Sequence, residues 1–392
     1  MSPRFAPWRV GGALFVVAYG SNVFTPLLGV YRRQLGLSAT MITSIFAMYA
    51  AGLLPGLLFA GPASDRVGRR RIAVPAVGLA GVASLVFVPA AGLAPLLYLA
   101  RFLQGVVTGV VFSVASAWLQ DLTRDPPVAA RRASLAMNAG FCLGPIASGM
   151  LGQYGPAPTT LPFVVHVAVV AVGLAVIFGV GDVLTKPLAD RRLLDFTMPH
   201  GTRRPFWLVL VPTAVCVFGF PSTAAAVLPL LLPVGGPSIA ETGVIAGVTL
   251  GAAALVTPAA GKLRSLAAPV GAVCGAGGFA VAAVASHGNT LFPLIGSAVL
   301  LGCGSGLTVT AGLVLAQQLA TQRTRGALSS AFYAWAYAGF AVPVIVTAAA
   351  GGGSLRGPLA AAAMVAAALA GWLAASSRWA PRGEPGRRSD AA

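Results

Sequence analysis

The sequence predicts an all-α polytopic membrane protein with twelve transmembrane helices in two pseudo-symmetric six-helix bundles. Of its 392 residues, 57% are hydrophobic and only 9% are charged, whereas a soluble domain carries about 25% charged residues. Apolar stretches of roughly 20 residues, the length that crosses a bilayer, recur along the whole chain. A weak internal repeat also relates the first half of the chain to the second.

Six predicted helices form an N-terminal bundle, residues 1–183. Glycine, proline or charged residues occur in the connections between the apolar stretches of this bundle, as is typical of turns and loops. Hydropathy places the helices at residues 9–29, 40–60, 72–91, 95–122, 133–154 and 161–183. Residues 184–204 form the longest polar segment before the tail, and we expect them to be a cytoplasmic linker between the bundles.

Six more predicted helices form a C-terminal bundle, residues 205–376. They are placed at residues 205–233, 240–261, 268–286, 290–319, 327–350 and 355–376. The tail, residues 377–392, has no apolar period and is predicted to be disordered in the cytoplasm.

The internal repeat aligns the fourth predicted helix with the tenth. The matching pairs are Gly105 with Gly302, Gly109 with Gly306, Gln120 with Gln317, Leu122 with Leu319 and, in the preceding loops, Gly61 with Gly261. The second loop keeps basic residues, Lys262 and Arg264, but has no aspartate. Chance similarity between glycine-rich helices is the alternative interpretation.

The net charge of +17 could indicate a nucleic-acid partner. Such a partner requires a basic face on a folded domain, with aromatic residues interleaved. Most basic residues here instead lie in loops that alternate to one side of the predicted bilayer, as positively charged loops do when they stay in the cytoplasm. We therefore expect cytoplasmic termini and no nucleic-acid partner. The four cysteines lie far apart in apolar segments, without metal-ligand spacing.

The most highly charged run of the first half follows the second predicted helix, at residues 61–71. Its spacing contains Gly61, Asp65, Arg66, Gly68, Arg69 and Arg70. This run resembles the signature loop of the major facilitator superfamily, Gly-x-x-x-Asp-Arg-x-Gly-Arg-Arg or Lys. The resemblance implies the fold of that superfamily (the MFS fold) and a transporter whose two bundles alternate access to a central site. A turn that only sets topology is the alternative.

The resemblance also implies a conformational latch at this loop. It places Asp65 near the start of the eleventh helix and Arg69 near the acid that ends the fourth helix, which here is Asp121. Because Asp65 and Arg69 are four residues apart, they share a face if a helical turn continues through the loop. The latch would then hold the cytoplasmic ends of the two bundles together.

Arg101 is the one charged residue predicted to lie within a span. It opens the pattern Arg101-x-x-x-Gly105, which resembles a motif that the superfamily associates with the central cavity and with proton movement. A charge in hydrocarbon costs about 2.5–3.5 kcal/mol, so it calls for a protein-lined or watery environment. The alternative is that Arg101 reaches to the outer interface.

The fifth predicted helix contains Gly140, Gly144, Pro145 and Gly149. This pattern resembles a motif of exporters that exchange drugs or metabolites for protons, with Ser148 in place of one glycine and without the motif's upstream part. Glycine and proline here allow bending and close helix approach. Generic packing of small residues is an equally open interpretation.

The resemblance implies a cavity lined from the middles of the first, fourth, seventh and tenth helices, with further residues from the fifth, eighth and eleventh. Its expected polar residues are Tyr19, Asn22, Thr25, Arg101, Gln104, Asn138, Thr213, Ser222, Thr223, Thr308, Tyr333, Trp335 and Tyr337. Neutral groups and aromatics around one arginine suit a small amphipathic molecule that is neutral or weakly anionic. The aromatics on the eleventh helix could instead be packing residues.

None of the nine acidic residues is predicted at mid-span, so His166 is the candidate proton site, with packing as its alternative. No phosphate-binding loop, metal cluster or catalytic set is present in the sequence, which argues against an enzyme and a cofactor. We expect a monomeric, proton-coupled antiporter for efflux in a bacterial plasma membrane. An importer or facilitator, and a receptor without transport, are the alternatives.

Overall fold

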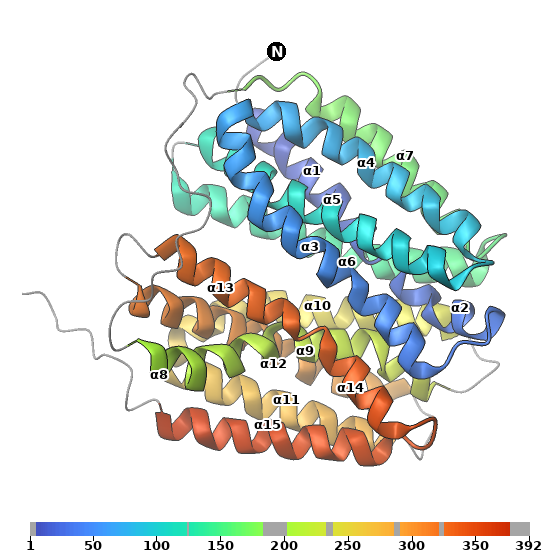
Figure 1. Cartoon of the computed structure of the whole chain (residues 1–392), viewed down its shortest axis with the longest axis vertical. Coiled ribbons are helices and arrows are strands. Elements are labelled where there is room, and N and C mark those ends of the chain that lie inside the picture. Colours follow the sequence, from blue (N-terminus) through green and yellow to red (C-terminus); the bar gives the residue numbers. More distant parts are fainter. Residues whose placement is uncertain are drawn as a thin grey trace, which may run out of the picture.

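The computed structural model describes residues 5–123, 125–182, 202–232, 238–285, 291–320 and 325–376. Every regular element in these residues is helical, which confirms the predicted class. The predicted tail and nearly all of the predicted linker lie outside the described residues. The described helices form two groups, with α1–α7 above and α8–α15 below in Figure 1.

The first group supplies the first six of the predicted passages. Its helices are α1 (Ala6–Ser21), α2 (Leu28–Gln34), α3 (Ala39–Val67), α4 (Arg69–Ala90), α5 (Ala94–Asp121), α6 (Pro126–Tyr154) and α7 (Leu161–Ile177). A short 3-10 turn, Thr25–Leu27, joins α1 to α2, and together they make one interrupted passage.

The second group supplies the other six passages. Its helices are α8 (Arg203–Pro205), α9 (Val211–Ala226), α10 (Ser238–Leu263), α11 (Ala267–Ala285), α12 (Leu291–Leu319), α13 (Arg325–Ala338), α14 (Ala341–Ala350) and α15 (Arg356–Ser376). A π-helical turn, Phe206–Leu210, joins α8 to α9, and a 3-10 turn, Arg264–Leu266, joins α10 to α11.

The structure corrects three predicted helix boundaries. The first passage is not continuous, because the chain leaves the helix at Asn22 and Pro26 cannot donate to a helical ladder. The eleventh is interrupted between α13 and α14, just before Pro343. In contrast, α3 continues through most of the predicted signature loop and ends only at Gly68, whose φ is +107°.

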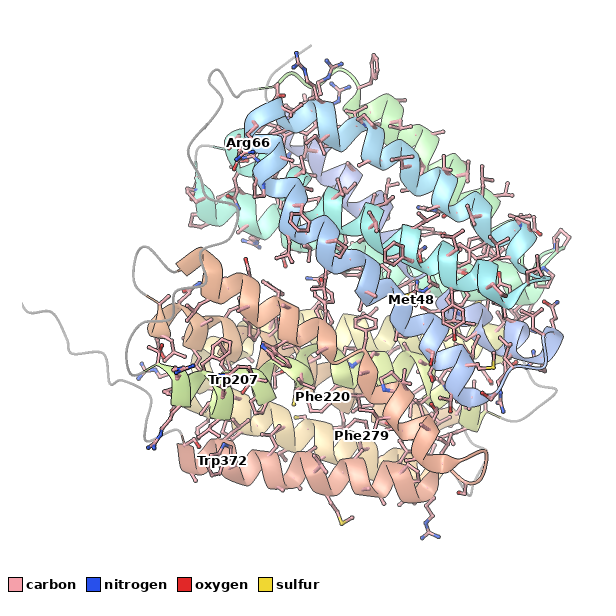
Figure 2. The ribbon with its side chains drawn as sticks, in the orientation of Figure 1. Met48, Arg66, Trp207, Phe220, Phe279 and Trp372 are labelled. Atoms are coloured by element: carbon pink, nitrogen blue, oxygen red, sulfur yellow. The ribbon has the colours of Figure 1, made fainter. Side chains whose placement is uncertain are left out.

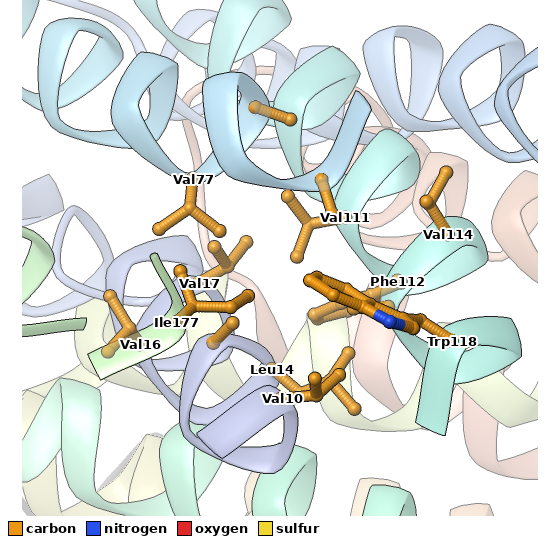
Figure 3. Close-up of a cluster of buried hydrophobic side chains, with 14 of the residues drawn as sticks. Val10, Leu14, Val16, Val17, Val77, Val111, Phe112, Val114, Trp118 and Ile177 are labelled. Atoms are coloured by element: carbon orange, nitrogen blue, oxygen red, sulfur yellow. The ribbon is translucent and has the colours of Figure 1, made fainter. Parts of the chain in front are cut away.

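A buried apolar cluster holds the first group together (Figure 3). Trp118 of α5 is fully buried in this cluster. Side chains from α1, α4, α5 and α7 also belong to it, among them Val10, Leu14, Val77, Val111 and Ile177. Because lipid tails are as apolar as these side chains, close van der Waals packing, and not exclusion from water, stabilises the contact between the helices.

Two glycines set the contact between α5 and α3. A Cβ atom at Gly105 would collide with the carbonyl oxygen of Tyr49, and one at Gly109 would collide with that of Leu53. The absence of side chains therefore lets these two helix backbones touch, as in other close helix crossings in membranes.

The second group repeats this contact between α12 and α10. A Cβ at Gly302 would collide with the carbonyl oxygen of Thr249, and one at Gly306 with that of Ala253. The glycine pairs that match in sequence thus make equivalent contacts in the two halves, which favours a true repeat over chance similarity.

The two groups touch at the end of the molecule remote from residues 61–71. We call the end that carries residues 61–71 the motif end. At the opposite end, the hydroxyls of Thr43 on α3 and Thr347 on α14 lie 2.9 Å apart and share a hydrogen bond. At the same end, the backbone N–H of Ile239 on α10 donates to the side-chain oxygen of Gln153 on α6 at 3.1 Å. These contacts join the halves at the opposite end.

Candidate functional site

A central cavity of about 550 Å³ lies between the two groups of helices. Its lining extends from the middle of the molecule toward the motif end, where it includes Leu57, Ser116 and Leu313. Since the halves are joined at the opposite end, the structure has the cavity on the motif side of that junction. A cavity of this size fits a drug-sized molecule.

Six of the predicted polar residues line this cavity. They come from both halves and are Asn22, Arg101, Asn138, Ser222, Tyr333 and Tyr337. Tyr333 and Tyr337 are four residues apart on α13, so their side chains share one face of that helix. The structure therefore brings these six side chains to one space.

Three other predicted residues of the first half do not line the cavity. Tyr19 is buried and stacks on the ring of His166, with centroids 5.9 Å apart. Thr25 is fully buried in the turn after α1. Gln104 lies behind Arg101, where its side-chain amide donates to the carbonyl oxygen of Gly20 at 2.7 Å.

The remaining predicted residues are in the second half and also lie outside the lining. Trp335 packs edge-to-face on Trp207 at 5.5 Å, because it is two residues from Tyr333 and so projects from another side of α13. Thr213, Thr223 and Thr308 donate to carbonyl oxygens of their own helices.

An aromatic group that was not predicted from the sequence also lines the cavity. Phe46 and Tyr49 come from α3, Phe218 from α9, and Phe340 from the break between α13 and α14. Phe218 stacks on Tyr337 with centroids 4.6 Å apart. The three-residue spacing of Phe46 and Tyr49 on a predicted helix is the sequence signal that could have placed both on one face.

Arg101 is held by carbonyl oxygens. Its side chain is only 1% exposed and lies inside the first half, not at the outer interface. One terminal nitrogen donates to Gln104 Oε1 at 2.6 Å and to the carbonyl oxygen of Ser21 at 3.1 Å. The other donates to the carbonyl oxygen of Phe46 at 3.1 Å. The Ser21 carbonyl belongs to the last turn of α1, where the helix interruption frees acceptors.

Three aromatic rings complete the surroundings of Arg101. The guanidinium carbon lies 4.7 Å from the ring centroid of Tyr49, 5.1 Å from that of Phe24 and 5.2 Å from that of Phe46. These cation–π contacts stabilise a cation without neutralising it. No acidic residue lines the cavity among the described residues, and the Nε atom of Arg101 has no hydrogen-bond partner. The cavity wall thus carries an unneutralised positive charge.

The glycines of the exporter-like pattern place α6 between the two halves. A Cβ at Gly140 or Gly144 would collide with the backbone of α1, at the carbonyl oxygens of Phe15 and Tyr19. Gly149 instead faces α10 of the other half, where its missing side chain makes room for Gly243. The helix can therefore press on its own bundle and on the opposite bundle at once.

Pro145 and Ser148 also belong to this seam. A Cβ at Gly243 would collide with the carbonyl oxygen of Pro145, so that glycine contacts α6 directly. Ser148, which replaces a glycine of the family pattern, donates to the carbonyl oxygen of Val23 at 2.6 Å. Val23 lies in the interruption after α1, so the substituted serine satisfies a carbonyl that has lost its helical donor.

His166 lies in the core of the first half, away from the cavity lining. Its Nδ1 atom lies 2.6 Å from the hydroxyl of Ser84, and its Nε2 atom lies 3.2 Å from the carbonyl oxygen of Val16. Since a carbonyl only accepts, Nε2 carries the proton and the serine hydroxyl donates to Nδ1. Gly20 leaves the space that the imidazole ring fills. Both ring nitrogens are satisfied, which supports the packing interpretation.

Glu241 is an acidic residue that was not predicted to belong to the site. It lies in the first turn of α10, two residues from Ile239, which contacts the other half. Its Oε2 atom is buried and has no hydrogen-bond partner among the described residues. The Glu241 carboxyl group therefore lies beside the hydrogen bond of Ile239 that joins the two halves.

The predicted latch residues meet at the motif end of the first half. Arg69 opens α4 and its guanidinium contacts two carboxylates: Asp65 at 2.6 Å and Asp121 at 3.1 Å. It also donates to the hydroxyl of Ser64 and to the carbonyl oxygen of Gly61. The Arg69 cluster, which we define as these five residues, thus joins α3, α4 and α5. All of its described contacts lie within the first half.

Neighbouring motif residues bind a partner that the sequence analysis did not assign. Asp182, just beyond α7, accepts the backbone N–H of Arg70 at 3.3 Å, near the positive end of the α4 dipole. The Arg70 side chain donates to the carbonyl oxygen of Phe178 at 2.8 Å. A Cβ at Gly68 would collide with Asp182, while Arg66 is exposed at the end of α3 (Figure 2).

Comparison with known proteins gives one family and several relatives. The profile of the Major Facilitator Superfamily matches residues 10–344. Multidrug resistance protein MdtL of Escherichia coli is 35% identical over 140 residues, and MdtL of Shigella boydii matches equally. Each match spans 35% of this chain and 35% of the relative.

Solved structures of similar fold cover nearly the whole chain. The peptide transporter POT in complex with sulfate aligns with a TM-score of 0.80 and 15% identity over 96% of this chain and 95% of that one. The nucleoside transporter NupG, as a mutant, gives 0.75 and 10% identity over 94% and 99%. These likenesses concern the fold, and together with the family profile they establish that the chain belongs to the major facilitator superfamily.

Proposed function

We propose that this transporter exports a small amphipathic organic compound, neutral or weakly anionic, in exchange for protons. As a multi-pass membrane transporter of its superfamily, the chain is not an enzyme. The direction of transport, export, is part of this proposal. It draws support from the 35% identical segment shared with a multidrug resistance protein and from the seam that Gly149 forms with Gly243.

The observation that carries the substrate class is the unneutralised charge of Arg101 in an aromatic cavity. A cationic drug would meet repulsion there, because no carboxylate lines the cavity among the described residues. An anionic or polar group of a substrate would gain charge-assisted hydrogen bonds from the guanidinium. Phe46, Phe218 and Phe340 offer apolar contact for the rest of such a molecule.

Alternating access requires a second state in which the opposite end opens. We propose that residues 1–183 and 205–376 then move as two bodies, linked by residues 184–204, with α6 and α10 sliding along their glycine seam. The Arg69 cluster would approach the start of α13 only when the motif end closes. In the present structure the cavity lies toward the motif end, and the cluster makes its contacts within the first half alone. This supports a latch that is released in this state.

The orientation in the cell is also proposed. Loop charges favour a cytoplasmic motif end and cytoplasmic termini, and the named relatives are bacterial. The proposal is therefore a bacterial plasma-membrane protein that works as a monomer. The state with its cavity on the motif side is then inward-facing.

Proton coupling needs a group that binds and releases a proton. His166 has both ring nitrogens satisfied, whereas Glu241 has a buried, unpartnered oxygen beside the junction of the halves. We therefore favour Glu241 over His166 as the proton carrier. Glu241→Gln should abolish proton-driven transport but keep substrate exchange, whereas His166→Gln should keep both; the reverse pattern would restore the assignment to His166.

Export is tested in inverted membrane vesicles that contain the purified or overexpressed protein. A panel of neutral, anionic and cationic amphipathic fluorophores is supplied with an imposed proton gradient. The proposal expects gradient-driven accumulation of anionic or neutral members inside the inverted vesicles. Accumulation in the opposite direction would identify an importer, and saturable binding without flux would identify a receptor; either result would reject export.

A further inference from the structure

A second cavity, of about 610 Å³, lies at the motif end of the second half. Its lining comes from the start of the seventh passage and from the motif ends of α10, α11, α12 and α15. Most of the lining is apolar and includes Leu208, Val209, Val314, Leu315 and Leu373. Thr310 is the one lining residue that this cavity shares with the central cavity. The two cavities are therefore lined by different sets of residues.

Two arginines give this apolar cavity a positive charge. Arg204, at the start of the seventh passage, and Arg264, between α10 and α11, both line it. No acidic residue is among the lining residues, which all belong to the described part of the chain. The other lining residues with a side-chain hydroxyl or amide are uncharged: Gln318, Ser265, Ser376 and Thr310. The cavity therefore combines an apolar wall with two cations.

The wall continues into exposed apolar surface. Leu208 and Trp372 both line the cavity, yet they are 43% and 47% exposed. The indole nitrogen of Trp372 donates to the carbonyl oxygen of Leu208 at 2.7 Å, which fixes α15 to the seventh passage. Figure 2 shows Trp207 and Trp372 at the same end of the molecule as Arg66. On a membrane protein, exposed apolar surface of this kind faces lipid, and tryptophan favours the interface.

Arg264 has an unusual backbone conformation. Its φ is +50°, in the left-handed region that residues other than glycine rarely occupy. Such strain persists where the surrounding structure maintains it, and it gathers at functional positions. The first half has glycine at its corresponding turn, Gly68. Because an arginine is kept where glycine would be less strained, we infer that its side chain, which lines the cavity, has a role there.

We propose that this cavity binds one anionic phospholipid. The headgroup phosphate would accept hydrogen bonds from Arg204 and Arg264, and an acyl chain would lie along the apolar wall toward Leu208 and Trp372. Basic pockets between transmembrane helices are suited to anionic headgroups, and arginine matches the geometry of phosphate. Continuity with lipid-facing surface favours a lipid over a soluble solute. The inference is independent of the transported substrate.

The test uses the full-length protein in vesicles of phosphatidylethanolamine and phosphatidylglycerol. After extraction, native mass spectrometry counts the phospholipids that stay bound to each chain. We expect one retained phosphatidylglycerol on the wild type and none in Arg204→Gln/Arg264→Gly. Each single substitution should reduce retention about tenfold, as expected for one charge-assisted hydrogen bond.

A steric variant tests the same site without changing its charge. Gly261 lines the cavity, and a Cβ there would meet no atom within 4 Å, so Gly261→Leu should fill the space without disturbing the helix. Its matched control is Gly371→Leu on α15, where a Cβ also meets nothing and which does not line the cavity. Gly261→Leu should lose phosphatidylglycerol, whereas Gly371→Leu should keep it.

Several outcomes would overturn the proposal. Equal phosphatidylglycerol retention in the wild type and the arginine variants would show that the arginines do not hold it. Equal retention of phosphatidylethanolamine would show general lipid packing without charge recognition. Retention of soluble decyl phosphate, with no retained phosphatidylglycerol, would assign the cavity to a soluble anionic amphiphile instead. Monodisperse elution of each variant serves as the check on folding.

Discussion

The motif ends of the two halves are built on the same helical frame but have opposite interiors. In the first half, Arg69 fills the space between the helices with two ion pairs, to Asp65 and Asp121. In the second half, Gln318 takes the place that matches Asp121, no aspartate follows Gly261, and a cavity of about 610 Å³ remains. The two motif ends thus differ at a few matched positions, with an ion cluster in the first half and a cavity in the second.

The same difference continues to mid-membrane. In the alignment that matches Gly105 with Gly302, the buried Arg101 corresponds to Ala298, which is also buried. The backbone contacts of the two glycines are equivalent, so the frame does not depend on the charge. The comparison teaches that close helix packing is shared by the halves, while buried charge is concentrated in the first.

The largest expected effect concerns Arg101. If the first half supplies the charge that binds substrate, Arg101→Ala should reduce transport of anionic substrates by two or more orders of magnitude, since loss of one partner of a buried charge pair costs about 2–5 kcal/mol. Arg101→Lys should keep only part of the wild-type transport rate, because lysine lacks the planar set of donors that can reach both the carbonyl oxygens and the substrate. Flux in proteoliposomes, normalised to inserted protein, measures both.

The matched control for this prediction is Arg131→Ala. Arg131 is exposed at the motif end, so its loss removes the same charge from the chain without touching the cavity. Transport should be unchanged. Wild-type flux in Arg101→Ala would mean that the arginine serves only packing, and the two halves would then not differ in substrate chemistry.

The next effect tests the shared frame. Gly105→Ala and Gly302→Ala each push a Cβ into a carbonyl oxygen of the neighbouring helix, and overpacking of this kind costs about 1–3 kcal/mol. Both should lower the thermal unfolding midpoint in detergent by similar amounts. In Gly12→Ala, where a Cβ meets no atom within 4 Å, the midpoint should rise slightly, because alanine is the better helix former. Clearly unequal decreases in the unfolding midpoint would show that the two glycine contacts are not equivalent in the two halves.

Much of this frame could be predicted from the sequence. Hydropathy alone gives twelve passages, and the spacing of Gly105 and Gly109 identifies the repeat. The helix interruptions were not predicted, because the mean hydropathy stays high across the segments that contain Pro26 and Pro343, so hydropathy carries no signal of a break. Gly68 was read as part of a loop, although a single residue makes the turn and α3 continues to Val67.

A smaller effect tests the Arg69 cluster as a latch. Asp65→Asn removes the charge that the latch would bring to the start of α13, and a carboxylate at a helix N-terminus gains about 0.3–1 kcal/mol, up to about 2 when partly buried. We expect the population to shift toward the state with its cavity on the motif side, by up to about tenfold, and turnover to slow more than substrate binding weakens. Spin-label distances between the motif ends of α3 and α13 report the shift.

Asp125→Asn is the control for the latch. Asp125 is an exposed acid at the same end, and its side chain does not cap α6. Its substitution should leave the distance distribution unchanged. An unchanged distribution in Asp65→Asn as well would reduce the cluster to a stabiliser of the first half, and the latch would have to be abandoned.

The candidate site was less predictable than the fold. Arg101 was identifiable because a charge within an apolar span demands an explanation. Trp335 was misplaced although it is two residues from Tyr333, a spacing that puts the two side chains on different sides of a helix and so excludes one of them from the cavity. Asp182 and Glu241 were missed because their importance comes from neighbours distant in sequence, the start of α4 for one and the junction of the halves for the other.

The smallest expected effect compares two residues in left-handed conformations. Arg264 has a φ of +50° in the second half, and Ala157 has a φ of +54° in the first. A left-handed conformation costs a non-glycine residue about 1–2 kcal/mol, whereas glycine loses more conformational entropy on folding, worth about 0.5–1 kcal/mol. In lipid-free detergent, Arg264→Gly and Ala157→Gly should therefore both raise the unfolding midpoint slightly.

Addition of phosphatidylglycerol should separate the two substitutions. A ligand that binds only the folded protein raises its stability in proportion to the logarithm of ligand concentration over Kd. The wild type and Ala157→Gly keep both arginines of the second cavity, so their midpoints should rise with the lipid, while Arg264→Gly should respond weakly. If Arg264→Gly lowers the midpoint without lipid, the arginine side chain is needed for the stability of the fold itself. Arg264 would then stabilise the motif end of the second half, as the Arg69 cluster stabilises that of the first.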